Sequence, residues 1–246
     1  MRRLTAMLVM LLALSGVGWA QWNQDGQQCF ELTKPETYNP DKALPYCNRA
    51  IQSGELTERN LATIYYYRAS IYSYKRDYKR AIPDYDQATR LDPSMAQAFN
   101  GRGFARFFLG EYEAAAKDFQ ESVEWRPEDL YALLWRYIML ARSGGDPSSS
   151  LEQWTKGKDF PDWPGELISL YRGRLSAQEA LKAADDSNPK RQREKKCEAY
   201  FYVGQHLLIQ GKKTEAVKMF RAAVATNVTE FVEHEAAKVE LKRLGS

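Results

Sequence analysis

The sequence predicts an all-α protein, a solenoid of antiparallel helix pairs with a capping helix at its C-terminal end. Three observations support this class: a period of 34 residues between 62 and 129, aromatic residues beside small ones in each repeat, and a proline that closes each repeat. Tyr65 and Pro93 of the first repeat return 34 residues later as Phe99 and Pro127. Small side chains let two helices approach, aromatic rings fill the space around the contact, and a proline cannot continue a helix.

The helix pairs follow one another along the chain, and we expect residues 21–246 to form a single domain. The regular pattern weakens after the Gly144-Gly145 turn and is interrupted near Trp163, while Ser176 and Glu179 form a capping-box pattern that opens a short helix. We predict a degenerate pair over 24–54, clear repeats over 62–95 and 96–129, a degenerate repeat over 130–160, irregular helices over 161–186, a repeat over 197–228 and a capping helix over 230–243.

The N-terminal segment has the layout of a secretory signal peptide over residues 1–20. Arg2 and Arg3 precede an apolar run, and Gly18 and Ala20 provide small side chains at the positions that a signal peptidase reads. An uncleaved membrane anchor is the alternative, because the apolar run is only slightly short of a spanning helix. The residues before Cys29 do not form a lipidation motif. We expect a soluble protein exported to the bacterial periplasm, without stable membrane insertion after cleavage.

Export changes how the cysteines are interpreted, because disulfides persist outside the cytoplasm. Cys29 and Cys47 lie close together in the degenerate first pair, and Cys47 stands where the clear repeats carry the aromatic Tyr85. We predict a Cys29–Cys47 disulfide that stabilises this pair by about 3 kcal/mol. Two buried thiols are the alternative. Cys197 is left unpaired, and we expect it to be buried.

Charge and motif content argue against several classes of function. A net charge of +3 gives no support to nucleic-acid binding, and we interpret the basic tract over 185–196 as a solvated helix start. His206 and His234 are the only histidines and show no metal-ligand spacing, so we expect no metal, no cofactor and no enzymatic activity. Arg68 and Arg102 recur with Asp84 and Asp118 at the 34-residue period, which predicts a repeated structural ion pair rather than catalytic carboxylates.

The repeat resembles the tetratricopeptide repeat (TPR), and the C-terminal third is similar to the NlpI-type periplasmic TPR proteins. The second resemblance is carried by Ala199-Tyr200-Phe201-Tyr202-Val203-Gly204, Ala222 to Val228 and Glu230 to His234. It implies an exported adaptor that brings cell-wall hydrolases and a processing protease together. This chain lacks the lipid-attachment cysteine of that group, so tethering to the outer membrane is not carried over.

In a TPR stack the first helix of each pair lines a concave groove, and the residues that do not pack between helices are the candidates for contact with a partner. Here those positions are largely apolar, which is typical of a protein interface. We expect the groove to bind a protein or peptide, as an extended or helical apolar segment. A self-assembling structural homo-oligomer or homodimer is the alternative, and an enzyme built around Trp163 is a third. The candidate groove residues are Tyr66, Ser70, Tyr74, Asn100, Phe104, Phe108, Tyr131, Leu134 and Arg142.

Overall fold

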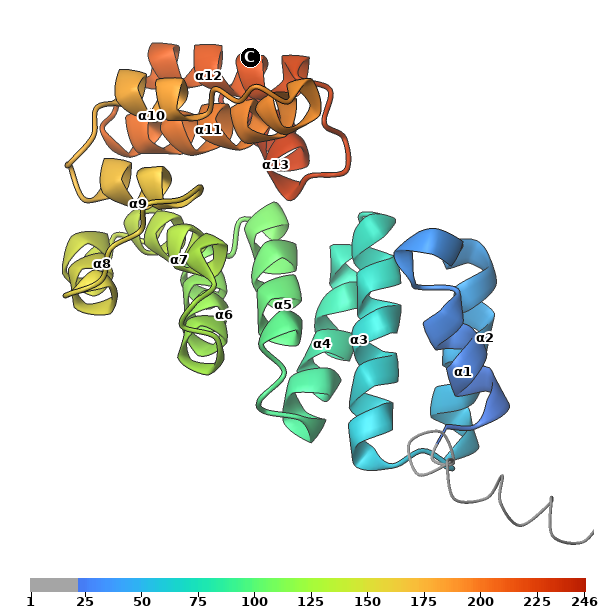
Figure 1. Ribbon diagram of the computed structural model, residues 1–246. Coiled ribbons are helices and arrows are strands. Elements are labelled where there is room, and N and C mark those ends of the chain that lie inside the picture. The colour runs from blue at the N-terminus through green and yellow to red at the C-terminus, as the bar shows by residue number, and fades with distance from the viewer. Residues whose placement is uncertain (1–21) are drawn as a thin grey trace, which may run out of the picture. The chain divides into compact units, whose positions relative to one another are not determined.

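The computed structural model describes residues 22–246, and every regular element in this range is a helix (Figure 1). The predicted signal peptide over residues 1–20 lies outside the described residues. The chain divides into two compact units, and the boundary between Ala105 and Arg106 falls inside helix α5. We describe each unit by itself. In the range that the model describes, no helix is both long enough and apolar enough to cross a membrane.

Unit 1 consists of paired antiparallel helices. Helix α3 lies beside α4, and α1 and α2 pack together and against α3 (Figure 1). The helices are α1 (Gln24–Glu31), α2 (Pro40–Ser53), α3 (Glu58–Tyr74), α4 (Tyr78–Leu91) and the first part of α5 (Ala96–Leu109), with a short 3-10 helix, η1 (Pro35–Thr37), between α1 and α2.

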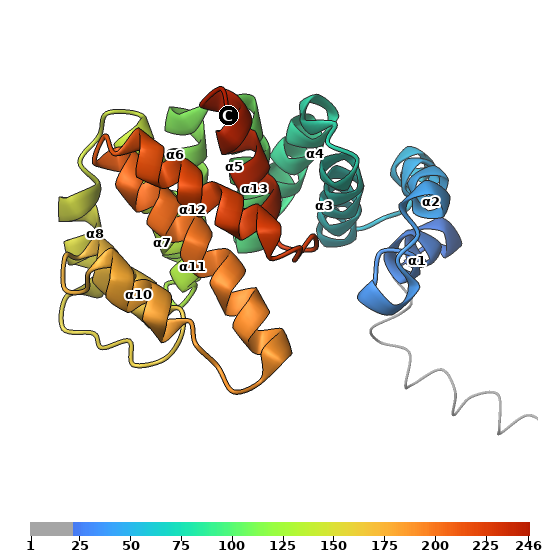
Figure 2. The same ribbon diagram turned by 90° about the horizontal axis from the view of Figure 1, so that it is seen from above.

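Unit 2 contains the last turn of α5 and the remaining eight helices. Figure 2 shows α11 and α12 side by side, with α10 along α11. Helix α13 packs on α11 and α12, which confirms the predicted capping helix. The helices are α6 (Tyr112–Trp125), α7 (Leu130–Arg142), α8 (Pro147–Thr155), α9 (Gly165–Tyr171), α10 (Ala177–Ala183), α11 (Pro189–Ile209), α12 (Lys213–Ala225) and α13 (Val232–Arg243).

The helix boundaries follow local signals in the sequence. Helices α4 and α6 end two residues before Pro93 and Pro127, as predicted. The predicted capping box is formed at the start of α10, where the Ser176 hydroxyl accepts from the Glu179 backbone and the Glu179 carboxylate accepts from the Ser176 backbone N–H. The capping box provides hydrogen-bond partners for backbone N–H groups that the start of a helix would leave unpaired. A proline has no backbone N–H and cannot continue a helix.

The first helix pair is closed by the predicted disulfide. Cys29 on α1 and Cys47 on α2 are bonded, and both are fully buried beside Ile64 and Ile71 of α3. Cys197 is a free, buried thiol on α11, and burial raises its pKa to about 11. The covalent link therefore replaces, in the end pair, the aromatic packing of the regular repeats.

Close helix packing depends on small residues beside aromatic rings, as the period indicates. A Cβ added at Gly101 would lie 2.5 Å from the Tyr85 ring, so α5 can approach α4 only with glycine at this position. In unit 2 the centre of the core is Trp135 on α7, which is fully buried. Its ring lies 5.0 Å from that of Phe107 and 5.1 Å from that of Phe201 on α11. Helix α11 thus packs directly against α7.

Candidate protein-binding surface

One face of α3 carries three of the predicted groove residues at a spacing of four. Tyr66, Ser70 and Tyr74 recur at i, i+4 and i+8, which places them on one side of a helix. The Tyr74 ring is 67% exposed, while Tyr66 and Ser70 are half-buried. The Ser70 hydroxyl donates to the Tyr66 carbonyl at 2.9 Å, so the polar group between the two rings is satisfied within the helix. The face therefore presents aromatic surface.

Tyr38, in the segment between η1 and α2, extends this surface. Its ring meets that of Tyr74 edge-on with centroids 5.2 Å apart, and it is 38% exposed. Burial, and secondly the neighbouring Tyr74, raise the pKa of Tyr38 to about 12, so its phenol is neutral at physiological pH. We call Tyr38, Tyr66 and Tyr74 the tyrosine face. Sequence reasoning missed Tyr38 because it stands in an irregular turn with no place in the repeat register.

A buried tyrosine supports the tyrosine face from below. Tyr85 on α4 is almost fully buried, and its hydroxyl lies 3.3 Å from Ser70 Oγ and 3.4 Å from Ser73 Oγ on α3. Its ring also lies 6.1 Å from that of Tyr66. Burial raises the pKa of Tyr85 to about 12. Tyr85 is therefore a neutral phenol that links α4 to α3 and packs beneath the Tyr66 ring.

Two further candidates lie on the part of α5 that belongs to unit 1. Asn100 and Phe104 are 34 residues after Tyr66 and Ser70, and both side chains are half-buried. Their partial exposure agrees with a contact surface, and their role stays a prediction. Phe108, the next member of this series, lies in unit 2. Its ring packs on Phe107 and its carbonyl accepts from Arg243 of α13 at 3.2 Å.

The equivalent face of α7 is covered by the protein itself, which corrects three of the predicted contacts. Leu134 is fully buried and cannot meet a partner. Tyr131 donates its hydroxyl to Glu198 of α11 at 2.9 Å. Arg142 forms an ion pair with Glu240 of α13 at 3.1 Å and donates to the Tyr112 hydroxyl at 2.8 Å. Tyr131 and Arg142 are engaged by side chains of α11 and α13, and the repeat period does not encode these contacts.

The two ends of α13 meet very different electrostatic surroundings. At its C-terminal end the fully buried Glu240 is balanced by Arg142 and by Arg243 at 2.8 Å. At its N-terminal end the buried Glu233 accepts from the Tyr202 hydroxyl at 3.0 Å, and the buried Glu198 of α11 accepts from Tyr131 and the indole of Trp163.

Glu198 and Glu233 have only neutral hydrogen-bond donors. Within residues 22–246, neither carboxylate lies within ion-pair distance of a lysine or arginine. Burial raises the pKa of Glu198 to about 7, with the Glu233 charge as a further cause, and burial also raises the pKa of Glu233. We refer to Glu198 and Glu233 as the acidic pair.

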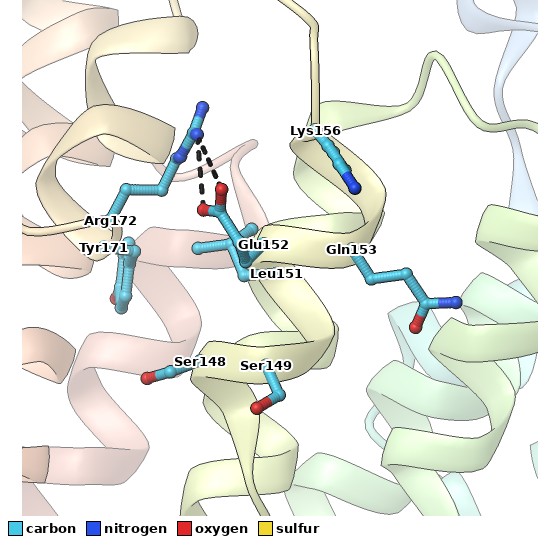
Figure 3. A pocket seen from close by; sticks show the side chains of 8 residues that line it. All are labelled: Ser148, Ser149, Leu151, Glu152, Gln153, Lys156, Tyr171 and Arg172. Carbon is cyan, nitrogen blue, oxygen red and sulfur yellow. Dashed lines mark hydrogen bonds and ion pairs between the residues drawn. The ribbon is translucent and has the colours of Figure 1, made fainter.

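The remaining polar groups of unit 2 have structural partners. The basic tract begins α11 as expected: Asp186 pairs with Arg191 and Lys195, and Asp185 with Lys196. A surface pocket of about 630 Å³ lies between α8 and α9, where Arg172 is neutralised by Glu152 (Figure 3). Its other lining residues are Ser148, Ser149, Leu151, Gln153, Lys156 and Tyr171.

The histidines and Trp163 also make contacts within the fold. His206 contacts the Tyr171 ring and the Gln210 amide, and His234 is buried on α13. Trp163, around which an enzyme site was the third hypothesis, donates its indole N–H to Glu198. These contacts agree with structural roles for all three residues.

Comparisons with known proteins identify the same repeat. The family model of the tetratricopeptide repeat matches residues 66–129. The lipoprotein NlpI homolog of Haemophilus influenzae is 27% identical over 187 residues, which cover 75% of this chain and 60% of that relative. The chain thus spans less than two thirds of the length of this relative.

A solved structure agrees with the fold class. A tetratricopeptide repeat protein from Parabacteroides merdae is 18% identical, with a TM-score of 0.53 over 96% of this chain and 90% of that one. At this identity the likeness concerns the fold alone, and it confirms the predicted all-α, TPR-like solenoid class. The chain therefore carries tetratricopeptide repeats over residues 66–129, has a TPR-like solenoid fold and resembles the NlpI-type proteins.

Proposed function

We propose that this chain is an exported, non-enzymatic adaptor that holds a helical segment of a partner protein against the tyrosine face. The observation that carries the proposal is the exposure of this face: Tyr74 and Tyr38 present large aromatic rings to solvent, backed by the buried Tyr85. Aromatic residues that are held rigidly and partly exposed are enriched in the centres of protein interfaces.

The form of the bound segment is inferred from unit 2, where the same repeat positions are covered. Leu134 and Ile138 of α7 are fully buried, and Arg142 is held by Glu240. The elements that contact this part of α7 through Tyr131 and Arg142 are α11 and α13, and both are helices. A helix that presents an apolar stripe at i, i+3 and i+4 is the segment that such a face accepts. We infer that the partner contributes a helix of this kind to the tyrosine face.

The proposed site of action is the bacterial cell envelope. The Cys29–Cys47 disulfide supports an oxidising compartment, and the likeness to a lipoprotein homolog supports the envelope. We extend the proposal to the regulation of cell-envelope hydrolases or proteases, for which the NlpI-type resemblance is the only support. We also propose that the chain does not bind nucleic acid, because its basic tract is paired with Asp185 and Asp186.

The test is a Tyr38→Ala/Tyr74→Ala double variant with Trp125→Ala as its matched control. Trp125 is also an exposed aromatic residue, at 52%, but it lies on α6 of unit 2. Tagged proteins are isolated from the exported fraction of the native host after mild crosslinking, and circular dichroism checks that each is folded. The double variant should recover at most about a tenth of the partner, because hot-spot aromatics contribute about 2 kcal/mol or more.

Two results would contradict the proposal. One is full recovery of every partner by the folded double variant. The other is a mass of two copies by light scattering that falls to one copy in the double variant, because this would assign the tyrosine face to a homodimer. The Trp125→Ala control should bind like the unmodified protein in both measurements.

A further inference from the structure

Three consecutive repeats carry an arginine at the same position of the first helix. These are Arg68, Arg102 and Arg136, each 34 residues after the last. Arg68 binds Asp84 through two nitrogens at 2.6 and 2.7 Å, which confirms the predicted pair. Arg102 lies 2.6 Å from the Asp86 carboxylate. In these two repeats the guanidinium has a carboxylate from a second helix.

Arg136 has no such carboxylate. It donates to the Ser150 hydroxyl on α8 and, over 3.4 Å, to the Gln120 amide oxygen on α6. Its Nε atom is buried without an acceptor, and burial lowers the pKa of Arg136. In the described part of the chain no acidic side chain lies within ion-pair distance of it. The charge of Glu124 partly offsets the effect of burial on the pKa of Arg136, and Glu124 accepts from the Gln120 amide at 2.9 Å.

Two positions account for the missing carboxylate. Gln120 stands 34 residues after Asp86, the partner of Arg102, and a one-residue shift of the second helix displaces the position of Asp84, the partner of Arg68. The N-cap residues Asp77 and Glu111 are 34 apart, but the next, Asp146, follows after 35 because the turn contains Gly144 and Gly145. Asp84 and Asp118 are each the seventh residue after their N-cap. The seventh residue after Asp146 is Gln153.

The neighbouring acidic residue does not replace this carboxylate. Glu152 is one position away, about 100° round the helix. It turns toward Arg172, the residue that follows α9, with the two charged groups 3.2 Å apart, while Gln153 points to the opposite side of α8 (Figure 3). Neutral amides therefore stand at both positions: Gln120 in place of Asp86, and Gln153 in place of Asp84 and Asp118.

We propose that Arg136, with Gln120 and Ser150, forms a binding site for a carboxylate of the partner polypeptide. A guanidinium that is partly desolvated and lacks a counter-ion gains a strong, charge-assisted hydrogen bond from an incoming carboxylate. A carboxylate can reach Arg136 from solvent by displacing the Gln120 side chain. Gln120 is exposed, and its hydrogen bond to Arg136 is long, at 3.4 Å. The inference rests on the proposed function, since the carboxylate would come from the adaptor's partner, but the site is separate from the tyrosine face.

The test is a titration followed by the Nε–Hε NMR signal of Arg136 in ¹⁵N-labelled protein, assigned by its loss in Arg136→Lys. The probes are an amidated, acetylated tripeptide with a central glutamate, its glutamine counterpart, and acetylated triglycine with a free carboxyl terminus. The Arg136 signal should shift saturably with a carboxylate probe and respond about tenfold more weakly to the glutamine peptide. The Arg68 signal, already paired with Asp84, should not move.

The two carboxylate probes separate the two sources of the ligand. A response to the glutamate peptide assigns an acidic side chain, and a response only to triglycine assigns a free C-terminus; both support the site. An unmoved Arg136 signal, or equal shifts with glutamate and glutamine, would overturn it.

A second variant keeps the test independent of any loss of folding. Gln153→Glu should supply the missing carboxylate from within the chain, raise the melting temperature relative to Gln153→Ala, and abolish the response to both carboxylate probes. A Gln153→Glu protein that still binds them as before would contradict the proposal. The probes are small peptides that do not depend on the tyrosine face. A negative titration at Arg136 therefore does not contradict partner binding by the tyrosine face, and loss of partner binding by the tyrosine face would not contradict the carboxylate site.

Discussion

Helices α3 and α7 present the same repeat positions in two different situations. In each, one face is formed by three residues spaced four apart, and the two sets are separated by two periods of 34: Tyr66, Ser70 and Tyr74 on α3, and Leu134, Ile138 and Arg142 on α7. On α3 the last of the three is 67% exposed, whereas on α7 the Arg142 side chain is 19% exposed and the other two are fully buried.

The difference shows that the position in the repeat determines the direction of a side chain. It does not determine whether other parts of the protein cover that side chain. The cover on α7 comes from α11 and α13, which are distant in sequence and meet it through Trp135, Phe201 and Glu240. Among residues 22–246, nothing covers the α3 face in this way at Tyr74 and Tyr38, which stay exposed. The same surface thus serves as core in one unit and as a proposed binding face in the other.

The largest expected effect is the difference in unfolding free energy between a substitution on the α7 face and one on the α3 face. Leu134→Ala should lower the free energy of unfolding by about 2–5 kcal/mol, because it leaves a cavity at a fully buried position. Tyr74→Ala should change it by no more than about 0.5 kcal/mol, because an exposed ring is removed. Urea unfolding followed by circular dichroism measures both. Equal costs for the two substitutions would show that the faces do not differ as described.

A smaller effect concerns the acidic pair, which helps to hold the cover on α7. The raised pKa of Glu198, about 7, means that its protonated form is favoured by folding. Its contribution to stability is complete below the unfolded pKa of about 4.5 and is lost as the pH rises through 7. Unit 2 should therefore lose roughly 2 kcal/mol between about pH 5 and pH 8 from this group.

The pH effect is checked with Glu198→Gln, which keeps the shape of the side chain and cannot ionise. This variant should unfold with a much flatter pH dependence and be more stable than the unmodified protein at pH 8. The control is Glu215→Gln on α12, an exposed glutamate whose substitution should preserve the original slope. If Glu198→Gln retains the full slope, the acidic pair does not carry the effect.

Much of the architecture could be predicted from the sequence because its determinants are local. The capping box at Ser176, the helix ends before Pro93 and Pro127, and the disulfide of the first pair follow from residues close together in the chain. The Arg68–Asp84 pair followed from the repeat period. In each case both partners belong to one helix or to neighbouring helices.

The candidate site could be predicted only in part. Tyr66, Ser70 and Tyr74 lie on one face as the period requires. Leu134 was wrongly assigned to an open groove because the repeat period does not encode whether a position is covered, and Leu134 is fully buried. Tyr38 was missed because its turn has no place in the repeat register. That Arg136 contacts an amide and a hydroxyl instead of a carboxylate depends in part on a one-residue shift of α8, which becomes visible only when the helix starts are known.

The most direct test of the open α3 face is site-specific photo-crosslinking in the native host. A benzophenone amino acid replaces Tyr74 in one protein and Trp125 in another, so that two exposed aromatic positions are compared. The Tyr74 position should yield one dominant crosslinked protein, with the attachment point in a segment of amphipathic helical pattern. Crosslinks that are equally strong from position 125, or absent from position 74, would contradict the claim that α3 presents a binding face.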